Sequence, residues 1–280
     1  MGWQAELELG FASVAGSTVI DRRAHRGPLA IQRPFYPEGP TSPGGNAREV
    51  CHVYLLHPPG GMVGGDELRI DVQVAAGAHA LVTTPAAGKA YRTTGAPVTQ
   101  TQTLHVADGG ALEWLPQETI VYDGAIATLE TRIELGLGAR FLGAETICFG
   151  LPARGEAFAR GACRQRFTIN RGGRPLFVER GRFDGGGAVH EAHWGLGGAT
   201  VMSLLVTCPA PPDAVVDEIR AVATGDDLGG VTVLGDRAAL VCRYAGRSAE
   251  RARAFLHAVW RLLRPPVFGR AAVAPRIWAT

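Results

Sequence analysis

The sequence contains a single lysine and no long hydrophobic segment, and we expect no secretion signal. Its amino terminus, MGWQAELELG, lacks the basic start and the continuous apolar run of a secretory signal. No stretch reaches the roughly 18 to 20 apolar residues that are needed to span a bilayer. The five cysteines are too widely scattered for a disulfide framework or a zinc knuckle. We therefore expect a soluble, cytoplasmic protein with reduced thiols and no membrane association.

Neither positive nor negative charge predominates in the sequence. The 28 basic residues, almost all of them arginine, are balanced by 26 acidic residues, so that the net charge is only +2. The molecule as a whole therefore has no field that attracts nucleic acid, and such binding would require a local basic patch. With 280 residues, of which 46% are hydrophobic, the chain is too apolar to be disordered and can bury a large core.

The motifs of nucleotide-binding and hydrolytic enzymes are also missing. Ala87-Gly88-Lys89-Ala90 resembles the end of a phosphate-binding loop, but Ala90 stands where a serine or threonine would hold magnesium. Residues 195–198 lack the third glycine of a dinucleotide fingerprint, because Thr200 occupies its place. There is no G-x-S-x-G nucleophile elbow. Any nucleotide is therefore expected to be bound by a partner.

Apolar residues recur mainly with a period of two, in short segments separated by glycine and proline. In residues 126–135, the polar side chains of Thr128, Glu130 and Arg132 share one face, as in a half-buried strand. In residues 98–104 one face is almost wholly polar. We predict strands over residues 5–9, 51–56, 68–74, 80–84, 98–106, 126–135, 141–149, 231–234 and 239–244.

Only two segments are predicted as helices, and both lie in the last third of the chain. From Asp213, apolar residues recur at helical spacing until Gly225 can end the helix. From Ser248, which can act as an N-cap, a second apolar stripe runs to Pro265 and Pro266. The chain is therefore predicted to be mainly β, with two α-helices near its end.

The loop PPGGMVGGD at residues 58–66 is unusually rich in glycine and proline. Its prolines restrict the backbone at the entry, and its glycines allow positive φ or close approach of the backbone. The loop is either a structural turn or a segment that wraps closely around another group.

The histidines do not predict a closed metal site. His190 and His193 are three residues apart, but the surrounding glycines favour an exposed loop over a tight metal site. His52 and His57 are five residues apart on a predicted strand and would point to opposite faces. Nothing resembles a four-ligand structural zinc site.

Several carboxylates lie within or beside apolar predicted strands, where an ionised group is costly unless it is paired, hydrogen-bonded or hydrated. One interpretation is a surface position or an ion pair with an arginine. Another is a set of weak oxygen ligands that line a wet internal passage for a divalent cation. A third is a glycosidase-like acid and base pair, made by Glu113 and Glu118. The carboxylates concerned are Asp66, Glu113, Glu118, Asp123, Glu145 and Glu179.

Four unusual sequence motifs follow one another along the chain. They are PPGG-x-VGGDEL at 58–68, LVTTPAAGKAYRT at 81–93, ALEWLPQETI at 111–120 and GAETICFGLPARGEAF at 143–158. These strings, together with LFVER at 176–180, resemble the urease accessory protein family UreD, also called UreH. The specific strings cover about the central 100 residues, and the carboxyl-terminal third is more generic.

The resemblance implies a mostly β, elongated, superhelical or sandwich-like fold in a single domain over residues 1–280. Within it we expect a β body at about 1–208 and a smaller β plus helix element at about 209–280. The family role would be that of a urease maturation factor without a catalytic site. It would bind a UreF-type partner, a UreG-type partner that binds GTP, and apo-urease. It would hold no tightly bound cofactor and would carry nickel only in transit.

Carried over by motif, the residues expected to meet nickel in an internal acidic passage are Asp66, Glu145 and Glu179. Lys89, Glu113 and Glu118 occupy further family-motif positions. The alternative to this scaffold is a β-rich hydrolase that uses Glu113 and Glu118 and turns over a substrate without partners.

Overall fold

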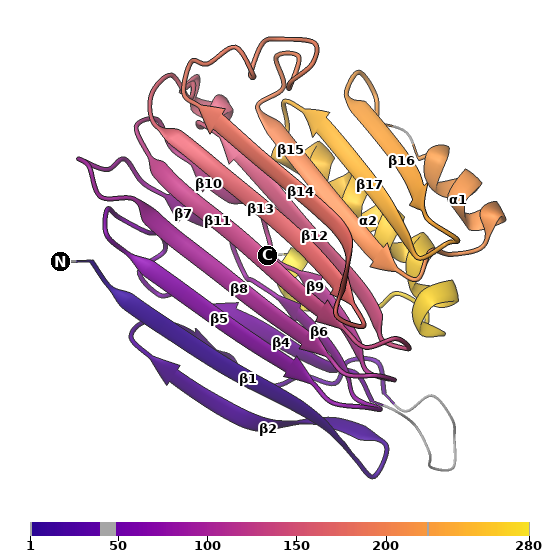
Figure 1. Ribbon diagram of the computed structural model, residues 1–280. Helices are drawn as coiled ribbons and strands as arrows, with labels where there is room; N and C mark the ends of the chain where they lie inside the picture. Colours follow the sequence, from indigo (N-terminus) through magenta and orange to yellow (C-terminus); the bar gives the residue numbers. More distant parts are fainter. Residues whose placement is uncertain (1, 40–48, 223, 280) are drawn as a thin grey trace.

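Two twisted β-sheets are stacked face to face, and helices cover the outer face of the second sheet (Figure 1). The computed structural model describes residues 2–39, 49–222 and 224–279. The first sheet has the order β14 (Arg174–Asp184), β13 (Ala162–Arg171), β11 (Ile126–Leu135), β8 (Val98–Val106), β5 (Glu67–Val74), β1 (Gln4–Val14) and β2 (Ser17–Arg26).

The second sheet has the order β16 (Leu228–Leu234), β17 (Ala239–Gly246), β15 (Val201–Cys208), β12 (Arg140–Phe149), β9 (Ala111–Leu115), β6 (His79–Thr83), β4 (Cys51–Leu56) and β3 (Ala30–Ile31). The short strands β7 (Gly88–Ala90) and β10 (Thr119–Val121) pair with each other, and β10 also pairs with β12. The residues after Cys208 therefore extend the second sheet by two strands and add the helices above it.

The chain alternates between the sheets in stacked coils. It passes from β5 to β6, back to β8, on to β9, back to β11, on to β12 and back to β13, with parallel pairing between successive strands of each sheet. Glu67, Thr99, Thr128 and Arg164 are stacked in register through four successive coils. This solenoid-like arrangement confirms the predicted elongated β fold. Because the coils differ in length, the sequence contains no repeat of fixed period.

Two apolar cores lie on the two sides of the second sheet. The first lies between the sheets and includes Leu7, Val72 and Phe167. The second lies between the second sheet and the helices and includes Val259 and Trp260. The strands of the second sheet are thus covered on both faces, which explains why β4, β6 and β9 are almost entirely buried.

The helices α1 (Asp213–Arg220) and α2 (Ala249–Phe268) confirm the two predicted helices, with different ends. The Ser248 side chain accepts a hydrogen bond from the Arg251 N–H at 3.2 Å, as expected of an N-cap. The prediction that α2 ends at Pro265 was wrong, because the helix continues to Phe268. Burial of this last turn against the second core offsets the loss of backbone hydrogen bonds at the prolines. Within the described residues, no helix is long and apolar enough to cross a membrane.

Every predicted strand is present, with bounds that agree with the prediction or differ by a few residues. The strands that were not predicted are β2, β3, β7, β9, β10, β13, β14 and β15. Of these, β2 and β14 are exposed, charged edge strands, and β3, β7 and β10 have at most three residues. Such segments lack the clear apolar alternation on which the prediction depends.

Candidate functional site

Polar side chains from four strands lie among the apolar side chains between the two sheets. Gln102 on β8, Thr131 on β11 and Gln165 on β13 are buried side chains of the first sheet. The Thr131 hydroxyl donates a 3.0 Å hydrogen bond to Gln102 Oε1. Glu145 on β12 comes from the second sheet, and the Gln165 and Thr131 side chains lower the pKa of its carboxyl group. We call these four residues the interior polar seam.

Glu145 is the titratable group of the interior polar seam. Burial raises its pKa to about 8, a shift that the Gln165 and Thr131 side chains oppose and the nearby Glu179 charge reinforces. At neutral pH most molecules therefore carry a protonated Glu145. Glu145 thus supplies an oxygen ligand that is neutral when protonated and negative when ionised.

A cavity of about 140 Å³ lies at the Gln102 end of the seam. Its lining includes Ile70 and Gln102 from the first sheet, Trp114 from the second sheet, and residues 60–62 of the glycine-rich loop. The loop is anchored beside β7, because the Met62 N–H donates to the Lys89 carbonyl at 2.7 Å. The loop thus packs against its own chain, as the structural-turn interpretation expects.

Lys89 is also part of the cavity lining, and its ammonium group lies 3.4 Å from the Gly60 carbonyl. It lies in the middle of strand β7 and not at the start of a helix. This placement agrees with the exclusion of a phosphate-binding loop, which requires a helix amino terminus after the lysine.

Asp66 closes the glycine-rich loop, and its carboxylate binds backbone N–H groups. It is 2% exposed. One carboxylate oxygen accepts from the Trp3 N–H at 2.7 Å, and the other accepts from the Val63 N–H at 2.8 Å. Asp66 therefore ties the start of the chain to the loop. The Asp66 charge also acts on His57. Burial lowers the pKa of His57, and the charge of Asp66 opposes this change without reversing it.

Glu179 lies on β14, beyond the interior polar seam. Its carboxylate accepts from the Arg243 guanidinium of β17 at 2.9 Å, so that this ion pair joins the two sheets. Its charge acts on Glu145, which places the two acids in the same neighbourhood. Glu145 and Glu179 thus lie within electrostatic range of each other, whereas Asp66 holds the loop in place.

A second polar cluster, of which the sequence analysis singled out the central acid Glu113 but not its partners, lies between the second sheet and α2. Glu113 is fully buried at its centre. Its carboxylate lies 2.8 Å from His79 Nε2, accepts from Trp260 Nε1 at 2.6 Å, and accepts from Arg264 Nε at 3.1 Å. Arg264 also contacts Glu38, which lies 2.7 Å from His52 Nε2. We call these residues the buried ionic cluster.

The buried ionic cluster keeps Glu113 ionised. Burial alone would raise the pKa of this carboxyl group, but the His79 hydrogen bond and the Arg264 charge outweigh it and lower the pKa to about 2. The partners of Glu113 come from β6 and from α2, far away in the chain. Only the presence of an acid in an apolar strand could have indicated such a cluster from the sequence.

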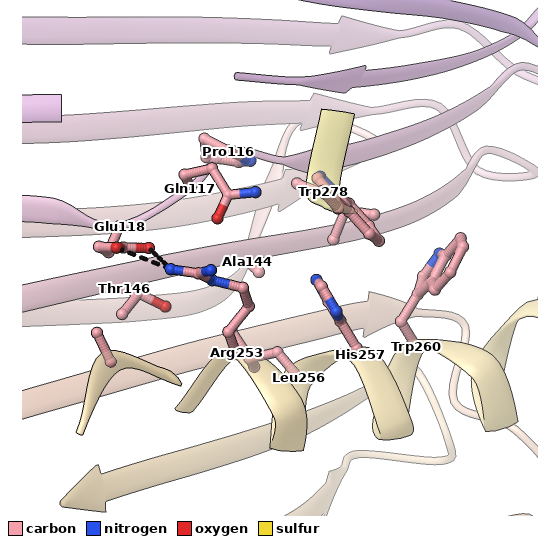
Figure 2. Close-up of a pocket in the computed structure, with 12 residues that line it drawn as sticks. Pro116, Gln117, Glu118, Ala144, Thr146, Arg253, Leu256, His257, Trp260 and Trp278 are labelled. Carbon is pink, nitrogen blue, oxygen red and sulfur yellow. Dashed lines mark hydrogen bonds and ion pairs between the residues drawn. The ribbon is translucent and has the colours of Figure 1, made fainter. Parts of the chain in front are cut away.

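Glu118 lies in a small pocket between the second sheet and α2 (Figure 2). Its carboxylate is paired with Arg253 at 3.1 Å. His257 stacks on Trp278 with 4.2 Å between ring centroids, and burial lowers the pKa of His257 to about 4. The hydrolase alternative is not supported, because Glu113 has no access to solvent and both carboxylates are paired with arginines.

The two histidines of the pair at 190 and 193 have different surroundings in the structure. His190 and His193 lie in a turn-rich loop, where the His190 ring packs against Phe149 and Phe158 and His193 is exposed. Among the residues that the structure describes, no group of three or more His, Cys, Asp or Glu residues is placed to hold a metal ion.

The comparisons with known proteins agree with the sequence motifs. The model of the family described as "UreD urease accessory protein" matches residues 4–279. A urease accessory protein UreD from Azoarcus sp. (strain BH72) is 46% identical over all of this chain and 95% of its own length. Proteins of the same name from Dechloromonas aromatica and Marinobacter nauticus are 42% and 45% identical, over 99% of this chain and 95% and 93% of their own lengths.

Both the family model and the relatives cover the β body, the buried ionic cluster and the carboxyl-terminal helices. On these grounds the chain belongs to the UreD family of urease accessory proteins.

Proposed function

We propose that, within urease maturation, the chain is a non-catalytic scaffold that helps to deliver nickel to apo-urease. It binds a UreF-type protein, and through that protein a UreG-type GTPase that binds the nucleotide. Membership of the family over nearly the whole chain is the observation that carries this proposal. The paired state of Glu113 and Glu118 further favours an accessory role over a hydrolytic one.

The interior polar seam supports an internal route for nickel. Gln102, Thr131 and Gln165 are buried polar side chains on three neighbouring strands. They lie between the cavity beside the glycine-rich loop and the acids Glu145 and Glu179. Polar groups in such a position are costly unless they have partners or water. Carboxylate, amide and hydroxyl oxygens bind a divalent cation weakly when they act one or two at a time, and weak binding suits transfer better than storage.

The accessory role can be tested by co-expressing urease subunits with UreF-type and UreG-type proteins, with and without this chain. We expect urease activity and urease-bound nickel to depend on the chain, and a complex that contains it to co-purify. Full activation without the chain would overturn the proposal.

The route is tested by Glu145→Gln and Glu179→Gln, with Glu134→Gln on the outer face of β11 as a matched control. We expect the first two variants to lower nickel incorporation severalfold while the complex still assembles. Asp66→Asn tests the third predicted residue. Because the Asp66 carboxylate accepts from two backbone N–H groups, we expect this variant to lose the ordered conformation of the glycine-rich loop together with activity. Loss of assembly in both Glu variants would instead assign them a structural role.

A further inference from the structure

Four arginines form a compact block on the outer face of the first sheet. Arg164 and Arg166 lie on β13, and Arg180 and Arg182 lie on β14, all with exposed side chains. The register places Arg164 directly opposite Arg182 and Arg166 directly opposite Arg180. Cβ atoms of such cross-strand pairs lie about 5 Å apart. We call these four residues the arginine block, and Figure 1 shows no helix over this face.

The charge of the arginine block is only partly neutralised. Arg182 pairs with Asp184 at 3.0 Å, and Arg166 lies 3.7 Å from Glu130. Glu130 itself is engaged by both Nε and Nη2 of Arg132. Within the described residues, Arg164 and Arg180 have no ion-pair partner. A chain with a net charge of only +2 thus carries a local excess of positive charge on β13 and β14.

This arrangement is unfavourable for the isolated protein, because like charges directly opposite each other destabilise a strand pair. Charged side chains do protect an edge strand such as β14 from unwanted pairing. That protection, however, does not require four charges of the same sign in opposed pairs, since alternating acids and arginines would protect the edge and stabilise the hairpin as well. The block therefore indicates a partner that supplies the missing negative charge.

We propose that the arginine block and the free edge of β14 bind an extended acidic segment of a partner protein. β14 is the last strand of its sheet, so one row of its backbone groups has no neighbouring strand. Side chains on one face of an added strand recur about every 6.8 Å, the spacing that separates Arg180 from Arg182. Val178, 48% exposed, precedes them on the same face. The matching segment carries two acids at alternate positions and one apolar residue two positions further along.

Guanidinium groups favour carboxylates, which they bind with two parallel hydrogen bonds. A nucleic acid fits less well, since the block spans only two residues along each strand and its face carries no aromatic side chain for stacking bases. The proposal concerns a protein contact and does not depend on the nickel route.

The test uses the full-length chain and a fluorescein-labelled peptide. In this peptide, threonine residues alternate with one valine and two glutamates. Fluorescence anisotropy measures its dissociation constant. We expect Arg180→Gln/Arg182→Gln to raise that constant about tenfold or more, since two charge-assisted contacts are lost. The control is Arg22→Gln/Arg26→Gln on β2, the opposite edge, which we expect to leave binding unchanged.

A second measurement separates binding from structure. Because the arginines repel one another, Arg180→Gln/Arg182→Gln should keep or raise the thermal midpoint, whereas residues retained for the fold would lower it on removal. The proposal is overturned if this variant binds the peptide as the wild type does, or if the peptide with glutamine in place of glutamate binds equally well. Tighter, arginine-dependent binding of a DNA oligonucleotide of the same charge would also overturn it.

Discussion

Glu113 is fully buried, yet its partners hold it in the ionised form. Glu113→Gln leaves the Arg264 guanidinium with Glu38 as its remaining acidic partner inside the molecule. Because a buried ion pair is strongly destabilising when one member is removed, we expect the free energy of unfolding to fall by about 3–5 kcal/mol. Urea denaturation measures this change.

The matched control is Glu8→Gln, which breaks the exposed pair with Arg22 and should cost less than about 1 kcal/mol. The pH dependence gives a second check. The pKa of Glu113 falls from 4.5 to about 2 on folding, so its stabilising effect is complete above pH 4.5 and is lost as the pH falls towards 2. Similar small effects of both substitutions would show that the buried ionic cluster contributes little.

Glu145 should show the opposite dependence on pH. Its pKa rises from 4.5 to about 8 on folding, so the folded state binds a proton that the unfolded state releases. The stabilising effect is complete below pH 4.5 and is lost as the pH rises through 8. We expect Glu145→Gln to abolish this loss and to gain roughly 1–3 kcal/mol relative to wild type at pH 9. Denaturation at pH 5, 7 and 9 measures it, and parallel pH profiles for the two proteins would contradict it.

At the scale of elements, α2 carries the aromatic and cationic side chains of the buried ionic cluster, so its first turn affects more than the helix alone. Ser248 accepts from the Arg251 N–H. We expect Ser248→Ala to lower the free energy of unfolding by about 1 kcal/mol, because that N–H then has only water. Ser248→Asp, which preserves the acceptor, should remain close to wild type in the same urea experiment. An equal loss in both variants would mean that the cap does not contribute.

For the whole molecule, the second sheet is shared by both cores. Its strands contact the first sheet on one face and α2 on the other. We therefore expect a single cooperative unfolding transition, with the same urea midpoint by far-ultraviolet circular dichroism and by tryptophan fluorescence. Separate midpoints would show that residues 209–280 form an independent unit. Removal of residues 209–280 should expose Leu81 and Leu142 and yield an aggregating protein.

Much of the fold could be predicted from local pattern. The alternation in residues 98–106 and 126–135 gives the bounds that the structure has. Prediction from local pattern was wrong where local propensity and tertiary packing disagree. Proline at 265 and 266 predicts a helix end, but burial of Val267 and Phe268 extends α2 by a further turn.

The candidate site was only partly predictable. Acids in apolar strands, such as Glu113 and Glu145, are recognisable because their burial is costly. Their partners are not recognisable, since Arg264 is far from Glu113 in the chain and Gln165 is far from Glu145. The opposite pKa shifts of these two similar-looking acids follow from that difference in partners.

The sequence by itself determined the family, the β character of the chain and the two helices, because these depend on local strings and on periodicity. Tertiary structure alone decided which acid is paired, which faces the interior polar seam, and which arginines stand side by side. Those properties depend on strand order and register, which bring distant residues within a few ångströms and set the dielectric environment and the neighbours of each charge.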